Sequence, residues 1–260
     1  MHSRWLRRAL LVAAALSPCV RGWKNVWIAP RGLGLSYLLQ QRQGWKTASA
    51  AVHSGQAVLC VPDAVMEHEL SQLIAASTSL ALDLQRSGSD GVTEDDPESS
   101  GVRMHVPTKL PSHEALCNKI IRRVLNVVDQ DFPCLVACLF GAQKTLCGLH
   151  AEERLEFSAN EPAINVYFGG GGFSPHKDYC ALTMLIPLTS PTDGSFTGGG
   201  TGFWAPESRR QPKAEPCITL APSAGTAMIF AGDVLHAGMP VETGTRVVLV
   251  ASFDRKLVAE

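Results

Sequence analysis

Two histidines and an aspartate in the second half of the chain have the types and spacing of a metal site. His176 and Asp178 are two positions apart in F-S-P-H-K-D, and His236 follows in G-D-V-L-H-A-G. On an extended strand, residues i and i+2 point to the same face, so His176 and Asp178 can reach one ion. Two imidazoles and a carboxylate suit Fe(II) and leave coordination positions open. We therefore predict His176, Asp178 and His236 as ligands of one metal ion.

Each candidate also has a simpler structural explanation. His176 could be a turn histidine hydrogen-bonded to Asp178, and His236 could sit at a barrel rim with its hydrogen bonds satisfied. Arg246 could be a surface arginine at the start of the last strand. The metal site is nevertheless favoured, because these residues occur together. All four lie in the required order, each at a predicted strand end, within one β-rich segment.

The elements that must position these residues are predominantly strands. Short apolar runs are separated by Gly, Pro and Asp clusters, with no helical periodicity between them. The predicted strands are 163–168, 181–188, 201–204, 217–220, 226–230 and 246–253. Strands at this density are typical of a sandwich or jelly-roll barrel.

The preceding part of the chain has helical periodicity. Apolar residues from Val65 to Leu80 recur at helical spacing, and a second amphipathic helix is predicted from Ser112, its N-cap. The polar, acidic segment 86–101 between them is predicted to be a solvated loop. Two longer stretches, 86–108 and 140–162, are candidate lids over a site.

These patterns predict an α+β fold, mainly β with N-terminal helices, around a double-stranded β-helix (jelly-roll) core. We divide the chain into an N-terminal targeting or disordered segment (1–50), a helical support region (51–160) and the jelly-roll core (161–260). The length of 260 residues fits one sizeable domain with accessory segments.

The net charge argues against nucleic acid as a partner. The chain carries 23 Lys and Arg against 24 Asp and Glu, a formal charge of −1. It lacks a basic patch with interleaved aromatic residues, which disfavours a nucleic-acid demethylase. Nothing in the sequence sets the oligomeric state.

The N-terminal segment has the composition of a targeting sequence. No acidic residue precedes Asp63, whereas several arginines and lysines do, and the apolar run 9–16 is too short to span a bilayer. Arginines before a short apolar run resemble a secretory (ER) signal, and the acid-free tract that follows resembles an organellar transit segment. We expect a cleaved targeting segment and no stable membrane span; an unstructured basic tail is the alternative.

The spacing of the eight cysteines does not indicate a compact disulfide framework. No C-x-x-C pair occurs, and the closest pair, Cys134 and Cys138, lies in an apolar run. Buried free thiols are the simplest interpretation. The even count leaves disulfides open for an exported protein.

The motifs around the candidate ligands resemble a known enzyme family. A four-glycine run (169–172) precedes F-x-P-H-x-D, and F-T-G-G-G-T-G-F-W (196–204) is followed by P-S-A-G-T-A-M-I-F-A-G-D-V-L-H-A-G. Over roughly 163–253, the sequence resembles the Fe(II)- and 2-oxoglutarate-dependent dioxygenase superfamily, specifically its prolyl 4-hydroxylase-like branch.

The resemblance implies roles for further residues. Arg246 matches the basic residue that pairs with the distal carboxylate of 2-oxoglutarate, although collagen-type prolyl 4-hydroxylases usually have lysine there. Tyr167, nine residues before His176, matches a tyrosine that helps to hold this co-substrate. Thr183 and Leu185 lie where the family turns side chains inward. Because halogenating relatives replace the carboxylate ligand, the retained Asp178 implies hydroxylation.

The implied function is hydroxylation of a substrate C–H bond, with a peptidyl proline as the first candidate and release of succinate and CO2. The cofactors implied are Fe(II), 2-oxoglutarate, O2 and ascorbate. A small-molecule hydroxylase of the same fold and a non-catalytic, cupin-like binding protein are the alternatives. No sequence feature separates a peptide from a small-molecule substrate.

Overall fold

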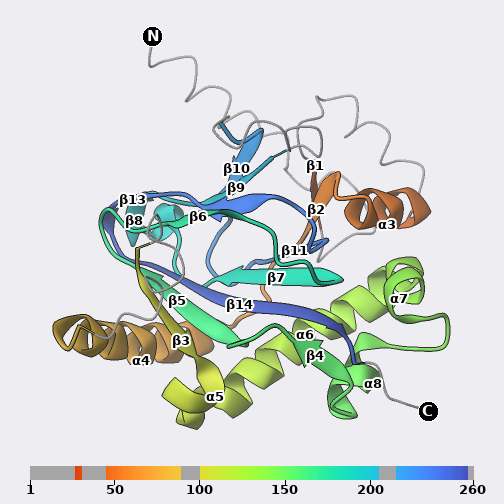
Figure 1. Ribbon diagram of the computed structural model, residues 1–260, viewed down its shortest axis with the longest axis horizontal. Helices are drawn as coiled ribbons and strands as arrows, with labels where there is room; N and C mark the ends of the chain where they lie inside the picture. The colour runs from red at the N-terminus through yellow and green to blue at the C-terminus, as the bar shows by residue number, and fades with distance from the viewer. Residues whose placement is uncertain (1–26, 31–44, 89–99, 205–214, 257–260) are drawn as a thin grey trace.

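A large antiparallel sheet forms the centre of the protein (Figure 1). The computed structural model describes residues 27–30, 45–88, 100–204 and 215–256. Strands in this sheet run in the order β1-β2-β11-β7-β14-β5-β3, and β4 also pairs with β14. Their bounds are Trp27–Pro30 (β1), Ala57–Val61 (β2), Val102–His105 (β3), Leu155–Phe157 (β4), Ala163–Tyr167 (β5), Leu182–Pro187 (β7), Ala227–Phe230 (β11) and Arg246–Arg255 (β14).

Two smaller antiparallel sheets complete the β structure. A four-stranded sheet has the order β10-β9-β12-β6, and β13 pairs with β8. In Figure 1 the strands β6, β9 and β10 lie above strands β7, β14 and β5 of the large sheet. The bounds are Phe173–His176 (β6), Phe196–Gly198 (β8), Thr201–Phe203 (β9), Ile218–Leu220 (β10), His236–Gly238 (β12) and Val241–Gly244 (β13).

The helices lie mainly on the other side of the large sheet, below it in Figure 1. They pack their apolar sides into the core cluster that also contains one face of β5, β7 and β14. The bounds are Trp45–His53 (α3), Glu67–Arg86 (α4), Val106–Lys109 (α5), Glu114–Asp131 (α6), Pro133–Phe140 (α7) and Leu146–Ala151 (α8).

Strand β14 contributes side chains to two hydrophobic clusters, one on each face of the large sheet. Alternate residues Val247 and Leu249 join the cluster beneath the helices, whereas Val248 and Val250 join the cluster between the sheets. Side chains alternate between the faces of a strand, so a strand covered on both sides is apolar throughout. The face of β14 that carries Val248 and Val250 is therefore the inner face, which points into the space between the sheets.

The predicted fold class is confirmed: the structure is mainly β, with antiparallel sheets and supporting helices. The helix predicted from Ser112 begins instead at Glu114, with His113 at its N-cap and a short 3-10 turn before it. The turn displaces Ser112 from the capping position, and its hydroxyl contacts the His113 ring.

Strands β2 and β3 lie in the region that the sequence indicated as helical. β3 pairs with β5 over Val102–His105, so the C-terminal part of the candidate lid 86–108 is a strand of the main sheet followed by α5. Residues 89–99, and most of the predicted loop 86–101 with them, lie outside the described residues. The division into three segments stays a prediction.

Among the described cysteines, Cys60, Cys117, Cys134, Cys138, Cys147 and Cys180 are free, but several of these are not buried. Cys60 and Cys117 are buried as expected, whereas Cys134 and Cys138 on α7 are exposed, because the helix turns Leu135 and Val136 inward in their place. Most of the predicted targeting segment lies outside the described residues, and its role stays a prediction. None of the helices in the described ranges is long and apolar enough to cross a membrane.

Candidate metal centre and its cavity

His176 and His236 face one another across the small sheet. His176 ends β6 and His236 begins β12, and the two are paired in the antiparallel register. Asp178 lies beyond the end of β6, so the expectation that it shares a strand with His176 is wrong. Its backbone N–H donates to the Gly232 carbonyl over 3.0 Å, which holds the loop against the segment before β12.

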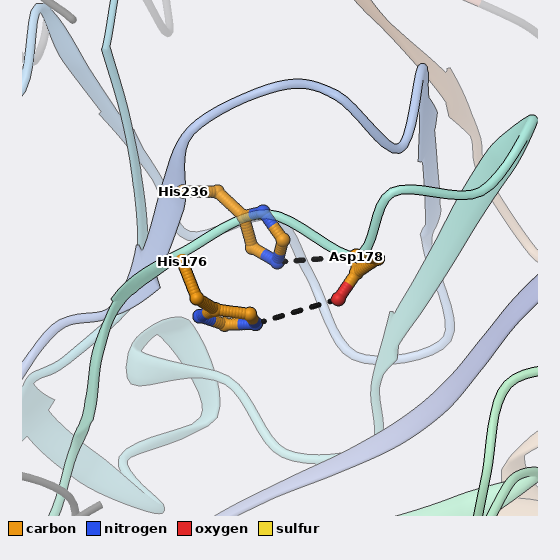
Figure 2. Close-up of side chains that lie close together, drawn as sticks. All are labelled: His176, Asp178 and His236. Atoms are coloured by element: carbon orange, nitrogen blue, oxygen red, sulfur yellow. Dashed lines mark ion pairs between the residues drawn. The ribbon is translucent and has the colours of Figure 1, made fainter.

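The three side chains converge on one point (Figure 2). One donor atom from each of His176, Asp178 and His236 lies within 4.8 Å of the other two. Nε2 of His176 is 3.5 Å from Asp178 Oδ1, and Nε2 of His236 is 3.7 Å from Asp178 Oδ2. The structure therefore brings together all three residues predicted as ligands.

Backbone contacts set the tautomer of each imidazole. Nδ1 of His176 is 2.8 Å from the Ser174 carbonyl, and Nδ1 of His236 is 3.1 Å from the Val234 carbonyl. A carbonyl oxygen only accepts, so each Nδ1 carries the proton and each Nε2 presents a lone pair to the cluster. This donor set fits a divalent ion such as Fe(II).

The carboxylate is kept ionised and oriented. When the two imidazoles are protonated, burial raises the pKa of Asp178, but the hydrogen bond from His176 and the charges of His236 and His176 outweigh it and lower the pKa to about 2. Thr183 Oγ1 also donates to Asp178 Oδ2 over 2.5 Å. The structure thus places Thr183 behind the aspartate, and it is not among the described residues that line the cavity.

A cavity of about 350 Å³ opens beside the triad. It is enclosed by the inner face of the large sheet, by the small sheet and by the loop before β5. The lining residues are Arg103, Ala159, Asn160, Glu161, Asn165, Tyr167, Phe173, His176, Asp178, Leu185, Thr201, His236, Gly238, Arg246, Val248 and Val250. Tyr167, Leu185 and Arg246 are thereby placed with the triad, as predicted, and the end of the candidate lid 140–162 contributes to the wall.

Arg246 is a buried cation in this cavity. It is only 3% exposed, and burial lowers the pKa of its guanidinium. Nη2 donates to Thr201 Oγ1 over 3.0 Å, and Cζ lies 5.4 Å from the centre of the Tyr167 ring. Among the described residues, no carboxylate lies within ion-pair distance of it. Because an unpaired buried charge is costly, this arrangement favours an anionic ligand.

The sequence reasoning missed several lining residues. Asn165 could have been found, because it lies two positions before Tyr167 and shares its strand face. No sequence pattern marks the other missed residues. Arg103 lies on a short edge strand, and Glu161 and Thr201 lie in segments without a recognisable spacing to the triad.

Known proteins share this architecture. Residues 162–253 match the family model described as the 2OG-Fe(II) oxygenase superfamily. No curated protein sequence matches the chain. Among solved structures, AviO1 from Streptomyces viridochromogenes Tue57 is 12% identical, with a TM-score of 0.51 over 82% of this chain and 96% of that chain.

Two further structures are similar. The epimerase SnoN from nogalamycin biosynthesis, described as non-heme and alpha-ketoglutarate-dependent, is 14% identical, with a TM-score of 0.51 over 81% of this chain and 82% of that chain. A viral collagen prolyl hydroxylase from Paramecium Bursaria Chlorella virus-1 is 18% identical, with a TM-score of 0.49 over 80% of this chain and 99% of that chain. At these identities the likeness to AviO1 and SnoN shows the fold alone, whereas the family match over residues 162–253 supports the resemblance to the superfamily that was drawn from the motifs.

Proposed function

We propose that this chain, whose residues 162–253 match the model of the 2OG-Fe(II) oxygenase superfamily, hydroxylates a substrate C–H bond. In the balanced reaction, one oxygen atom of O2 enters the new hydroxyl group and the other enters succinate, while 2-oxoglutarate loses CO2. The observation that carries the proposal is the buried Arg246, which has no carboxylate partner among the described residues and shares one cavity with the His176, Asp178 and His236 triad.

The three ligands supply a preorganised metal site. His176 and His236 would hold Fe(II) through Nε2, and Asp178 through its carboxylate, with Thr183 fixing the carboxylate orientation. When bound, the iron and 2-oxoglutarate supply the oxidising chemistry. Open positions at such a three-ligand ion are needed for both the co-substrate and O2.

Residues of the large sheet would hold the other end of the co-substrate. Arg246 presents a planar guanidinium that can grip a carboxylate through two hydrogen bonds. Tyr167 lies beside it in the sheet register, and Thr201 fixes it from the small sheet. The aliphatic side chains of Leu185 and Val248 line the same cavity and would exclude water from it.

The finer assignments rest on the sequence resemblance. A peptidyl proline is the substrate that the prolyl 4-hydroxylase-like motifs favour, and a small molecule is the alternative. Ascorbate is proposed on the same ground, as the reductant that rescues oxidised iron. A cupin-like protein without turnover would bind a ligand in this cavity but form no succinate.

The test is succinate production by the purified full chain with Fe(II), 2-oxoglutarate, ascorbate and O2. We expect slow turnover even without the prime substrate, and its loss in both His176→Ala and Arg246→Ala. His68→Ala and Arg86→Ala, which change exposed residues on α4, serve as matched controls and should retain activity. Iron binding without succinate, with proline-rich peptides present, would favour the binding-protein alternative, and absence of iron binding would overturn the proposal.

A further inference from the structure

Four polar side chains form a continuous hydrogen-bond chain along one wall of the cavity. Arg103 on β3 pairs with Asn165 on β5 in the sheet register, and its Nη1 donates to Asn165 Oδ1 over 3.2 Å. Nη2 of the same guanidinium donates to Glu161 Oε1 over 2.5 Å. At the other end, Asn165 Nδ2 lies 3.0 Å from Tyr167 Oη. All four residues line the cavity.

The direction of every hydrogen bond in this chain is determined by Arg103. A guanidinium has donors and no acceptor, so Asn165 must turn its carbonyl oxygen toward Arg103. The amide NH2 group of Asn165 then faces Tyr167. Because NH2 only donates, the Tyr167 oxygen accepts at this contact, and the phenol must direct its own proton elsewhere.

The guanidinium itself is held in place by a buried carboxylate. The Glu161 side chain is 5% exposed, and its second oxygen accepts a hydrogen bond from the backbone N–H of Ser252 on β14. The phenol is also kept protonated, because burial raises the pKa of Tyr167 more than the charge of Arg246 lowers it. A proton donor of fixed direction therefore stands beside Arg246.

We propose that Asn165, oriented by Arg103 and Glu161, is a positioning residue that directs the Tyr167 hydroxyl proton into the cavity, where it donates to a carboxylate of 2-oxoglutarate. The inference rests on the proposed function and deepens it. Tyr167 and Arg246 are register partners on β5 and β14, so the phenol donor and the guanidinium can address one anionic group together.

The test is 2-oxoglutarate affinity, measured by titration calorimetry on the full chain with Mn(II) in place of Fe(II). In Asn165→Asp, the new carboxylate only accepts and would capture the Tyr167 proton. We expect about tenfold weaker 2-oxoglutarate binding, as for one lost hydrogen bond to a charged group. In the Tyr167→Phe background, Asn165→Asp should weaken 2-oxoglutarate binding by less than about threefold. The difference between the two losses of affinity is the coupling between Asn165 and Tyr167, which a double-mutant cycle isolates.

A second variant, Arg103→Lys, keeps a positive charge beside Glu161 but cannot donate to both partners in the same fork geometry. It should weaken 2-oxoglutarate binding when Tyr167 is present and leave it unchanged in Tyr167→Phe. Asn126→Asp, the same chemical change at an exposed position of α6, is the matched control.

Three outcomes would overturn the inference. Unchanged affinity in Asn165→Asp and Arg103→Lys, with tight binding by the wild type, would reject the positioning role alone. An equal loss with Tyr167 and with Phe at that position would show a general structural or charge effect. Absence of 2-oxoglutarate binding by the wild type would overturn the proposed function together with this inference.

Discussion

At the scale of single residues, the proposed metal site also depends on groups other than its three candidate ligands. Thr183 is fully buried on β7, and its hydroxyl donates to Asp178, the proposed carboxylate ligand. Partners of this kind fix the orientation of a ligand, and their loss commonly weakens metal binding by about 10- to 100-fold. The threonine is therefore expected to control metal affinity although it lies outside the cavity wall.

Replacing Thr183 with valine tests this expectation, because the shape is retained and the hydroxyl is lost. We predict about tenfold weaker Mn(II) binding by Thr183→Val, measured by titration calorimetry. Thr183→Ser keeps the donor and should bind Mn(II) within about threefold of the wild type. Equal affinity of the valine variant and the wild type would show that Asp178 needs no such support.

The residues predicted from sequence were those with a strict spacing. His176, Asp178 and His236 are brought together as expected, and Tyr167 and Arg246 share their cavity. Arg103 could not be predicted, because its role depends on a sheet partner, Asn165, that is 62 residues away in the sequence. The position of Asp178 in a loop could not be predicted either. The alternation of side chains along a strand indicates which face a residue lies on, but it does not indicate where the strand ends.

At the scale of elements, an ion pair joins the two long helices beneath the sheet. Arg123 on α6 donates through Nη1 and Nη2 to the two carboxylate oxygens of Glu69 on α4, over 2.8 and 2.9 Å. The Glu69 side chain is 1% exposed and also accepts the N–H of Met66 at the start of the helix. The hydrogen bond from Arg123 is the main cause that lowers the pKa of Glu69, against burial, to about 2.

This pKa shift predicts a pH-dependent contribution to stability. Because the folded-state pKa is below the ordinary value of 4.5, the contribution is complete above pH 4.5 and is lost as the pH falls toward 2. Glu69→Gln should therefore lower the free energy of unfolding by about 3 kcal/mol at pH 7. The gap between the two proteins should narrow below pH 4.5, as measured by urea unfolding at each pH.

The exposed Glu67, two positions earlier on the same helix, provides the matched control. Glu67→Gln should change the free energy of unfolding by less than about 0.5 kcal/mol, as is usual for a surface position. A gap between wild type and Glu69→Gln that stays constant from pH 7 to pH 3 would contradict the assignment of the shift to this ion pair.

The sequence located most elements of the core but not the edges of the large sheet. The runs 163–168, 181–188 and 246–253 coincide with β5, β7 and β14, because strands buried on both faces are apolar throughout. β3, with the sequence V-R-M-H, has only four residues and turns an arginine toward the cavity. A strand this short is defined by its pairing with β5 rather than by its own composition.

At the scale of the whole molecule, the site spans two sheets. The histidines belong to the small sheet, whereas Tyr167 and Arg246 belong to the large one. A molecule that binds both the metal and Arg246 must therefore bridge the sheets. Binding to the folded state alone stabilises it in proportion to the logarithm of ligand concentration over Kd, about 2.7 kcal/mol at one hundred times Kd.

We predict that Mn(II) and 2-oxoglutarate together raise the melting temperature of the full chain by about 5 to 10 °C at such a concentration, measured by scanning calorimetry. Arg246→Met should abolish the part of the shift that depends on 2-oxoglutarate and keep the part due to Mn(II). Without ligand, the variant should melt at the same or a higher temperature, because it no longer buries a charge that lacks a carboxylate partner among the described residues. Arg86→Met, at an exposed arginine, should behave as the wild type in both conditions. An equal 2-oxoglutarate shift in wild type and Arg246→Met would contradict Arg246 as the residue through which the ligand binds to the large sheet.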